Sequence, residues 1–338
     1  MKTLHFFLFL ILSSLFFIGV CSDNQTSMQS SSKAKYPFPQ NVNYKYGIRV
    51  SKPANDKIQE HYIDWLTRFY EEHPTDPTLA RIKFDDPQYT VSEGIAYGML
   101  IFVYMDNEKN NTQPKFDKIW NYFKLHSKSI HGLMSWRILG WDSVTDPNSA
   151  TDAELDIAMT LLMAHKQWGS NGAVNYLEEA KELIRKIWLY EIKDGKIIKP
   201  SDAWEDFTSP SYFLTASLET FKYVDKEHAW DSVIVNCYRM LRKGRHPETG
   251  LVSDWVYLDG SVVTKDNRDR FHYDAARTPW RTSMAYSWFG HEDAKEFSSK
   301  ITEWVTAKYK NKWKCFLCNH NYVKSSYALD GSTTSTYG

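Results

Sequence analysis

The sequence predicts an all-α protein whose mature part forms one domain. Apolar residues recur at helical spacing in nine stretches, most of them about 10 to 20 residues long, the usual length of a globular helix. No linker of low complexity divides these stretches, and no glycine-rich strand–turn–helix signal for a nucleotide occurs. The alternation of helices with long loops suits a helical toroid, in which the loops gather at one end.

The predicted elements follow from local patterns along the chain. Two short hairpins are expected at 191–198 and 255–263, because each contains an Asp-Gly pair of the kind that tight hairpin turns favour. Pro279 suits the first turn of a helix, and Cys237 lies in an apolar helical stretch and is expected in the core. The predicted helices cover residues 55–70, 92–105, 115–126, 152–168, 174–190, 210–224, 229–243, 278–289 and 293–309.

The composition excludes several classes of function. The 338 residues include 41 basic and 41 acidic side chains, so the chain lacks the basic surplus that binding to nucleic acid or to an anionic membrane surface requires. Aromatic residues make up 15% of the chain. Most of these rings are expected in a helical core, while a minority can form platforms on which a neutral sugar stacks, and composition alone does not choose between the two.

The N-terminus predicts export. Lys2 is followed by an uncharged apolar run (4–20), and the chain turns polar directly after Cys21, as in a secretory signal. An uncleaved membrane anchor is the alternative, because the run is just long enough to span a bilayer. Cys21 lies where a lipoprotein signal would be cleaved, so we expect a signal peptide over 1–21, a flexible tether over 22–35 and a lipid anchor at Cys21. The expected location is the outer membrane or cell surface, the periplasm or the medium.

A second cysteine feature lies near the C-terminus. Cys315 and Cys318 form a CxxC pair with His320 close behind. A structural zinc site needs a second pair of ligands at a suitable spacing, and the sequence has none. We therefore expect two thiols or a local disulfide there, and no metal.

Three segments place a carboxylate among small residues and rings, the first of them at 90–100. Ser92 can cap the helix that follows, which would put Glu93 in the first turn, where the helix dipole favours a negative charge. In the functional alternative Glu93 is a general acid. The small residues around it leave room for a ligand, Tyr97 polarises or shields the carboxyl, and surrounding rings raise its pKa.

The second segment is the helix predicted over 152–168. Asp152 lies at the helix entrance, where its structural role would be that of an N-terminal cap. Asp156, one turn further on, is expected to be a solvated or hydrogen-bonded carboxylate. His165 is expected at the surface or with a hydrogen-bond partner.

The third segment, at 271–281, joins a loop to a helix. Asp274 can pair with Arg277 or Arg281 for purely structural reasons. In the functional alternative Asp274 is a base or a sugar ligand whose charge the arginines hold.

Taken together, these segments resemble glycoside hydrolase family 8. The resemblance runs from about Tyr36 to the end, so we place the catalytic domain at 36–338. It departs from the family's pattern at Glu154, where Asp is usual, and at Thr160, where Ser or Ala is usual. The motifs that carry it are TVSEGIAYGML (90–100), ATDAELDIAMTLLMAHKQW (150–168), which is close to the family's signature helix, SPSYF (209–213) and YDAARTPWR (273–281).

The resemblance implies an (α/α)6 barrel that hydrolyses β-1,4 linkages with inversion and without a metal or organic cofactor. By position, Glu93 looks like the family's general acid and Asp274 like its general base. Asp152 looks like the carboxylate that binds and orients the distorted sugar. The residues similar to its substrate-binding groups are Trp136 and Trp204 as stacking platforms, Tyr212 and Arg277 around the base and its water, and Tyr97 beside the acid.

The chemistry of inversion needs these residue types. One protonated carboxyl donates its proton to the leaving oxygen, and one ionised carboxylate activates a water on the other side of the sugar ring. The two carboxyl groups lie about 6.5–9.5 Å apart. We therefore expect Glu93 and Asp274 at that separation.

The resemblance also implies that the barrel is incomplete. The family's barrel normally has twelve helices, whereas about nine are predicted here. In relatives a loop similar to 330–332 is followed by at least one more helix. We therefore expect a C-terminally truncated barrel, missing its last helix or helices, with apolar surface left uncovered.

The motif TVSEGIAYGM is more like the cellulase branch than the xylanase branch, where Arg more often precedes the Ser/Thr-Glu pair. The expected activity is endo-acting hydrolysis of cellulose-type or mixed-linkage β-glucan by a monomer. Xylanase, lichenase and chitosanase activities are the alternatives within the family. A noncatalytic glycan-binding lipoprotein is the alternative from another class, although such a protein has no need of all three carboxylates.

Overall fold

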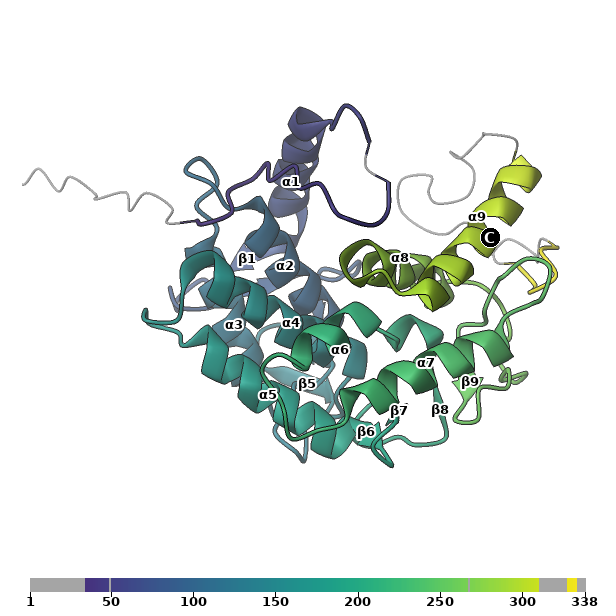
Figure 1. Cartoon of the computed structure of the whole chain (residues 1–338). Helices are drawn as coiled ribbons and strands as arrows, with labels where there is room; N and C mark the ends of the chain where they lie inside the picture. The colour runs from purple at the N-terminus through teal and green to yellow at the C-terminus, as the bar shows by residue number, and fades with distance from the viewer. Residues whose placement is uncertain (1–33, 49, 267, 310–326, 333–338) are drawn as a thin grey trace, which may run out of the picture. The chain divides into compact units, whose positions relative to one another are not determined.

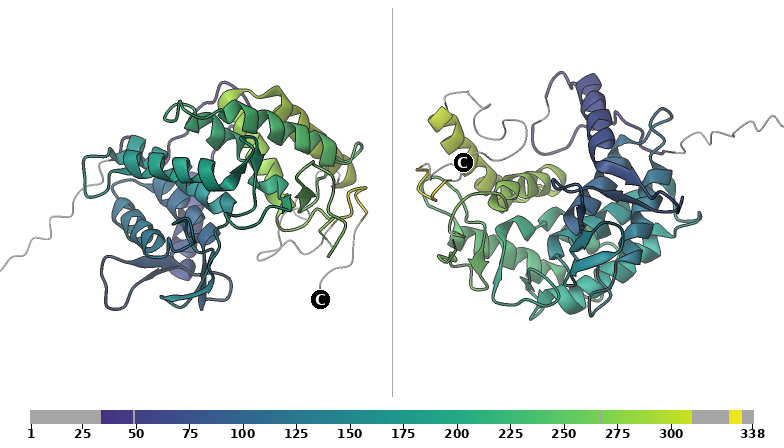
Figure 2. Two further views of the ribbon diagram at one scale, coloured as in Figure 1. Left: turned by 90° about the horizontal axis from the view of Figure 1, so that it is seen from below. Right: turned by 180° about the vertical axis from the view of Figure 1, so that it is seen from behind.

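Figures 1 and 2 show the structure, a computed structural model that describes residues 34–48, 50–266, 268–309 and 327–332. In these ranges the chain is predominantly helical, with short strands between the helices. The predicted signal peptide, the Cys21 anchor, most of the tether and the Cys315–Cys318 pair lie outside the described residues. Within them, no helix has the length and apolarity that a membrane crossing requires.

Eight of the described helices pack as four consecutive pairs. These pairs are α2 (Ser92–Met105) with α3 (Gln113–Leu125), α4 (Thr151–Trp168) with α5 (Tyr176–Glu191), α6 (Thr215–Phe221) with α7 (Trp230–Gly244), and α8 (Thr278–Phe289) with α9 (Glu292–Tyr309). The first helix of each pair also packs against the first helix of the next pair, so α2, α4, α6 and α8 are neighbours in that order. The N-terminal helix α1 (Asn55–Phe69) packs against α2.

The burial of these helices follows their sequences. α4 is buried on nearly every side, since small and apolar residues occur all around it. α7 instead buries one stripe, which includes Val233, Cys237 and Leu241 at helical spacing, and exposes its charged face. Cys237 is thus confirmed as a core residue. The carboxylates of α4 are drawn into the interior with the rest of the helix, where each needs a partner.

The nine short strands among the described residues pair antiparallel in small sheets. β1 (Tyr70–Glu72) pairs with β2 (Ala80–Ile82), β6 (Ile192–Lys193) with β7 (Ile197–Ile198), β8 (Phe207–Thr208) with β9 (Val256–Tyr257), and β4 (Arg137–Leu139) with both β3 (Tyr89–Val91) and β5 (Ser143–Asp146). The hairpin predicted at 191–198 is confirmed, with Asp194 and Gly195 both at positive φ in its turn. At 255–263 the chain does turn tightly, but β9 pairs with β8, and the predicted hairpin is reduced to the bridge between Val256 and Val262.

The helix predicted over 210–224 is wrong in its first half. The chain forms a 3₁₀ turn, η1 (Pro210–Tyr212), and the α-helix begins only at Thr215. The Ser209 hydroxyl accepts the backbone N–H of Ser211 at 3.2 Å, which gives the backbone a local alternative to helical bonds. The remaining predicted helices are present, and Pro279 lies in the first turn of α8 as expected.

Candidate active site

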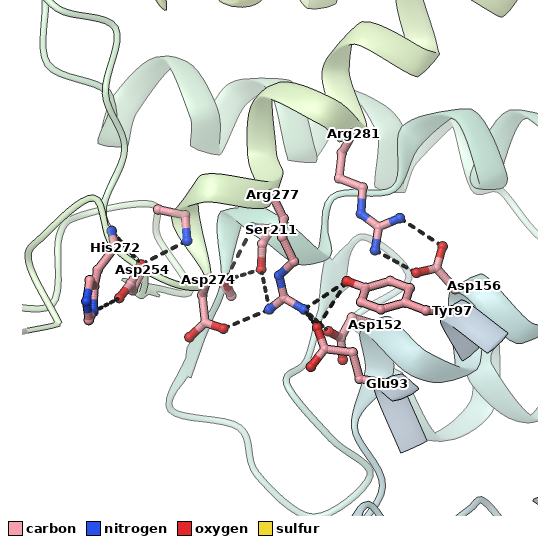
Figure 3. Close-up of polar contacts among 12 residues, drawn as sticks. Glu93, Tyr97, Asp152, Asp156, Ser211, Asp254, His272, Asp274, Arg277 and Arg281 are labelled. Atoms are coloured by element: carbon pink, nitrogen blue, oxygen red, sulfur yellow. Dashed lines mark hydrogen bonds and ion pairs between the residues drawn. The ribbon is translucent and has the colours of Figure 1, made fainter. Parts of the chain in front are cut away.

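Arg277 joins three carboxylates that come from three parts of the fold (Figure 3). Its Nη1 donates to Oε1 of Glu93 and, at 2.8 Å, to Oδ2 of Asp152. Its Nη2 donates to Oδ1 of Asp274 at 2.7 Å. The structure therefore brings together the three carboxylates that the sequence singles out, and Arg277 lies between Glu93 and Asp274.

Three of the mutually packed helices begin at this site. Glu93 lies in the first turn of α2, Asp152 in the first turn of α4, and Arg277 is the residue that precedes α8. The positive ends of these helix dipoles favour negative charge there. The predicted capping roles are wrong for both Ser92 and Asp152, because Val91 and Ala150 occupy the cap positions and neither helix has a side-chain cap.

Backbone hydrogen bonds hold the start of α2 beside the loop that precedes α4. The N–H of Ser92 donates to the carbonyl of Trp136 at 2.9 Å, and the N–H of Trp136 donates to the carbonyl of Asn148 at 2.8 Å. Trp136 thus lies directly beside the helix that carries Glu93. Sequence reasoning gave no signal for this contact, since β3 and β4 have only three residues each.

A buried aspartate that the sequence analysis missed holds the turn that carries Asp274. Oδ1 of Asp254 accepts the backbone N–H groups of Ala275 at 2.8 Å and His272 at 3.1 Å. Such a carboxylate fixes the turn by local hydrogen bonds to the backbone. A single Asp in a loop segment has no distinguishing pattern in the sequence, so this role becomes visible only in the fold.

The charges at the site perturb one another. Burial, and next the carboxylate of Asp254, raise the pKa of Asp274 to about 7. Burial also raises the pKa of Asp152, and the nearby charge of Arg281 opposes that rise. Burial lowers the pKa of Arg277 to about 9, which leaves it a cation at neutral pH. The guanidinium of Arg277 thus forms ion pairs with three carboxylates.

The side chains around this ion cluster include most of the other predicted residues. The Tyr97 hydroxyl donates to Oε1 of Glu93 at 3.0 Å. Tyr212 is buried, and its ring centroid lies 5.9 Å from Cζ of Arg277. Ser211, which the sequence analysis did not single out, accepts from Nη2 of Arg277 at 3.2 Å. Tyr97 lies at the Nη1 end of the guanidinium with Glu93 and Asp152, whereas Ser211 lies at the Nη2 end with Asp274.

Trp204 stands apart from this cluster. Its side chain is on a loop and 47% exposed, and its backbone N–H donates to the Ser201 hydroxyl at 3.1 Å. Among the contacts of the described residues, none joins it to the three carboxylates. The structure therefore does not bring Trp204 together with the other predicted site residues.

A second buried ion pair lies next to the site. Arg281 donates to the two oxygens of Asp156 at 2.9 and 2.6 Å, and both side chains are almost completely buried. Asp156 is therefore the hydrogen-bonded carboxylate that the sequence allows, and the partner of Arg281 is Asp156 instead of Asp274. His165, at the other end of α4, is partly buried and bonds to the Ser170 hydroxyl at 2.8 Å.

Removal of the arginine from this pair should destabilise the protein strongly. We expect Arg281→Met to lower the free energy of unfolding by about 3–5 kcal/mol, since it leaves Asp156 buried without a counter-charge. Urea unfolding followed by circular dichroism measures the loss. The double variant Arg281→Met/Asp156→Leu should recover most of it, because apolar replacement of both partners is often neutral. Equal stability of Arg281→Met and the wild type would contradict this account.

In the part of the chain that the structure describes, no cluster of three or more His, Cys, Asp or Glu side chains has the arrangement of a metal site. The three carboxylates converge instead on a guanidinium. An arrangement of this kind can bind and orient a hydroxylated ligand and can exchange protons with it.

Comparisons with known proteins show which family this chain resembles. The family model for glycosyl hydrolases family 8 matches residues 75–335. "Endoglucanase 2" of Ruminiclostridium josui is 34% identical over 345 residues, covering 96% of this chain and 69% of that protein. "Endoglucanase A" of Acetivibrio thermocellus is 37% identical over 304 residues, covering 86% of this chain and 62% of that protein.

Solved structures show the same fold. The apo structure of a β-1,3-1,4-glucanase from Paenibacillus sp. X4 superposes with a TM-score of 0.81 at 29% identity, covering 90% of this chain and 84% of that chain. A reducing-end-xylose releasing exo-oligoxylanase superposes with a TM-score of 0.69 at 24% identity, covering 83% of this chain and 77% of that chain, which shows the fold alone. The extent of the family match and the identity to its curated relatives show that this chain belongs to glycoside hydrolase family 8.

Proposed function

We propose that this protein cleaves β-1,4-glycosidic bonds within cellulose-type or mixed-linkage β-glucan chains, with inversion at the anomeric carbon. The observation that carries the proposal is the convergence of Glu93, Asp152 and Asp274 on one arginine. Names of relatives support the substrate class, since those with 34% and 37% identity are endoglucanases and the glucanase structure superposes better than the exo-oligoxylanase.

The exposure of the three carboxylates suits three different roles. The side chains of Glu93 and Asp274 are 37% and 31% exposed, so both can meet substrate and water. Asp152 is 3% exposed and fixed by Arg277. We assign Glu93 as the general acid at the leaving oxygen and Asp274 as the general base that activates water. Asp152 is the carboxylate that binds and orients the distorted sugar.

The residues around these carboxylates have supporting roles. Arg277 and Tyr212 hold the base and its water, and Tyr97 holds the acid through its 3.0 Å hydrogen bond. Trp136 and Trp204 are the stacking platforms, because an aromatic face packs well against the apolar face of a neutral sugar ring. The 47% exposure of Trp204 suits a platform further along the glucan chain.

The finer features of architecture and location belong to the same proposal. The order α2, α4, α6, α8, each with its paired helix, supports an (α/α)6 barrel. The domain over 36–338 follows a signal peptide over 1–21 and a tether over 22–35. Export as a lipoprotein attached through Cys21 places a monomeric enzyme where polymeric glucan occurs.

Reducing-sugar release from carboxymethyl cellulose, barley β-glucan, xylan and chitosan tests the proposal. We expect turnover of the two glucans, and a loss of about 10²–10⁴-fold in kcat with Asp274→Asn, which removes the base. Proton NMR of the first product should show the α-anomer. Binding without turnover would favour a glycan-binding lipoprotein, and undiminished turnover by Asp274→Asn would remove Asp274 from its role.

A further inference from the structure

Two glutamates outside the ion cluster are buried in an unusual way. Glu154 lies in the first turn of α4, and Glu191 is the last residue of α5. Both have no exposed surface. The Oε2 atom of each lacks a hydrogen-bond partner among the described residues. Two buried carboxyl oxygens without partners are costly, so their arrangement needs an explanation.

The other oxygen of each glutamate holds a loop. Oε1 of Glu154 accepts the backbone N–H of Met134 at 3.2 Å, just before Trp136 in the chain. Oε1 of Glu191 accepts the hydroxyl of Ser149 at 2.6 Å, just before α4 begins. The two glutamates therefore bond to the segments that lead to Trp136 and to Asp152.

Ser149 extends this arrangement to a third loop. Its hydroxyl accepts the N–H of Asp202 at 2.9 Å, and its own N–H donates to Oδ1 of Asp202 at 3.1 Å. Asp202 lies just before Trp204 in the chain. The loops that carry the two proposed platforms and the loop that leads into α4, where Asp152 lies, are thus linked through these two glutamates and Ser149.

We propose that Glu154 and Glu191 share one proton and act as a positioning pair for these three loops. The proton lets one Oε2 donate to the other, which satisfies both atoms while each Oε1 keeps its loop. The Glu191 charge is, after burial, the largest influence that raises the pKa of Glu154, as expected for carboxyls that lie side by side. The assignment of a positioning role rests on the proposed function, because it concerns the glucan-binding loops.

The charged groups that face the pair come from three segments. They are Asp152 on α4, Lys199 and Asp202 on the loop after β7, and His131, whose Nδ1 lies 3.3 Å from Asp202. The Thr151 hydroxyl is also close to Glu191, although it lies outside hydrogen-bond geometry. Burial raises the pKa of Glu191 to about 8. Burial and the Glu191 charge also raise the pKa of Glu154, so the shared proton is lost only where the pH exceeds the raised pKa of both carboxyls, and the two buried carboxylates then repel one another.

The variant Glu191→Gln tests whether the two glutamates share a proton or make only a structural contact. The amide N–H of the new side chain donates to Glu154 at every pH, so this hydrogen bond no longer depends on a titratable proton. In the wild type the raised pKa contributes stability at low pH, which is lost as the pH rises from about 4.5 through about 8. We expect the free energy of unfolding, measured with urea between pH 5 and 9, to fall less with rising pH in the variant than in the wild type. The difference between the two slopes should correspond to one proton. Glu182→Gln, at an exposed site on the same helix paired with Arg185, is the matched control and should follow the wild type.

Kinetics distinguish positioning from stability alone. Between pH 7 and 9 the KM of the wild type for barley β-glucan should rise several-fold more than the KM of Glu191→Gln, because Arg277, with a pKa of about 9, titrates alike in both proteins. Changes in kcat with pH should be the same in both proteins. Glu191→Ala, which removes the contact, should raise KM at every pH.

Parallel pH curves for the wild type and Glu191→Gln would overturn the proposal. If Glu191→Gln does not fold, Glu154→Gln makes the same comparison with the amide on the other partner. Failure of both to fold would also overturn it, because either amide satisfies the same oxygen. Absence of glucan turnover in every protein would refute the proposed function, while the unfolding curves would still decide whether the proton is shared.

Discussion

Glu93→Gln should lower kcat on barley β-glucan by about 10²–10⁴-fold, the range that a general acid contributes. The amide keeps the size of the side chain and can still accept from Tyr97, but it has no proton to give to the leaving oxygen. Reducing-sugar release at saturating substrate measures the effect. KM should change little, because the stacking residues and Asp152 are untouched.

The choice of leaving group makes this prediction specific. A dinitrophenyl β-cellotrioside expels a stable anion that needs no proton, so Glu93→Gln should cleave it with only a small loss. Asp274→Asn should be slow on both substrates, because water still has to be activated. Equal losses for Glu93→Gln on glucan and on the aryl glycoside would show that Glu93 is not the acid.

Arg277→Met should affect stability and activity together. The substitution leaves three neighbouring carboxylates without their shared cation, and breaking such a buried pair costs about 3–5 kcal/mol in free energy of unfolding. Activity should fall strongly as well, since Asp152 and Asp274 lose the group that orients them. Urea unfolding and glucan turnover on the same preparation measure both effects.

The pH dependence of this variant provides its check. Loss of the cation raises the pKa of the carboxyls further, so the folded variant takes up protons that the unfolded chain does not bind. Stability is then greatest at low pH and falls more steeply than in the wild type as the pH rises to and beyond about 7, the pKa of Asp274 in the wild type. An equal loss of stability at pH 5 and pH 8 would contradict this. Arg277→Lys should recover part of the stability but little activity, since an ammonium cannot bridge with two nitrogens.

The helices and the individual residues of the central ion cluster could be predicted from the sequence, because local patterns identify both. The apolar spacing of α4 identifies a helix, and the motifs around Glu93, Asp152 and Asp274 are distinctive enough to single out these residues. Arg277 was expected to pair with Asp274, which lies three residues earlier, and that contact is present. Its bonds to Glu93 and Asp152 follow only from the fold.

The residues that sequence reasoning missed act through contacts with distant parts of the chain. Asp254 binds the backbone of a turn 18 to 21 residues further on, and Ser149 bonds to Glu191, 42 residues away. Periodicity and motif spacing contain no information on such pairs. The short strands were missed for a similar reason, since two or three residues cannot show the alternation that predicts a strand.

The separation in sequence of the groups around Arg277 also has a consequence for folding. Arg277 is 184 residues from Glu93 and 125 residues from Asp152, so these ion pairs join residues that are far apart in the sequence. Contacts of this kind form late, after the loop-closure entropy of the intervening chain has been overcome. Helical signal should therefore return early in refolding while catalysis returns last, which makes enzymatic activity a sensitive reporter of complete tertiary assembly.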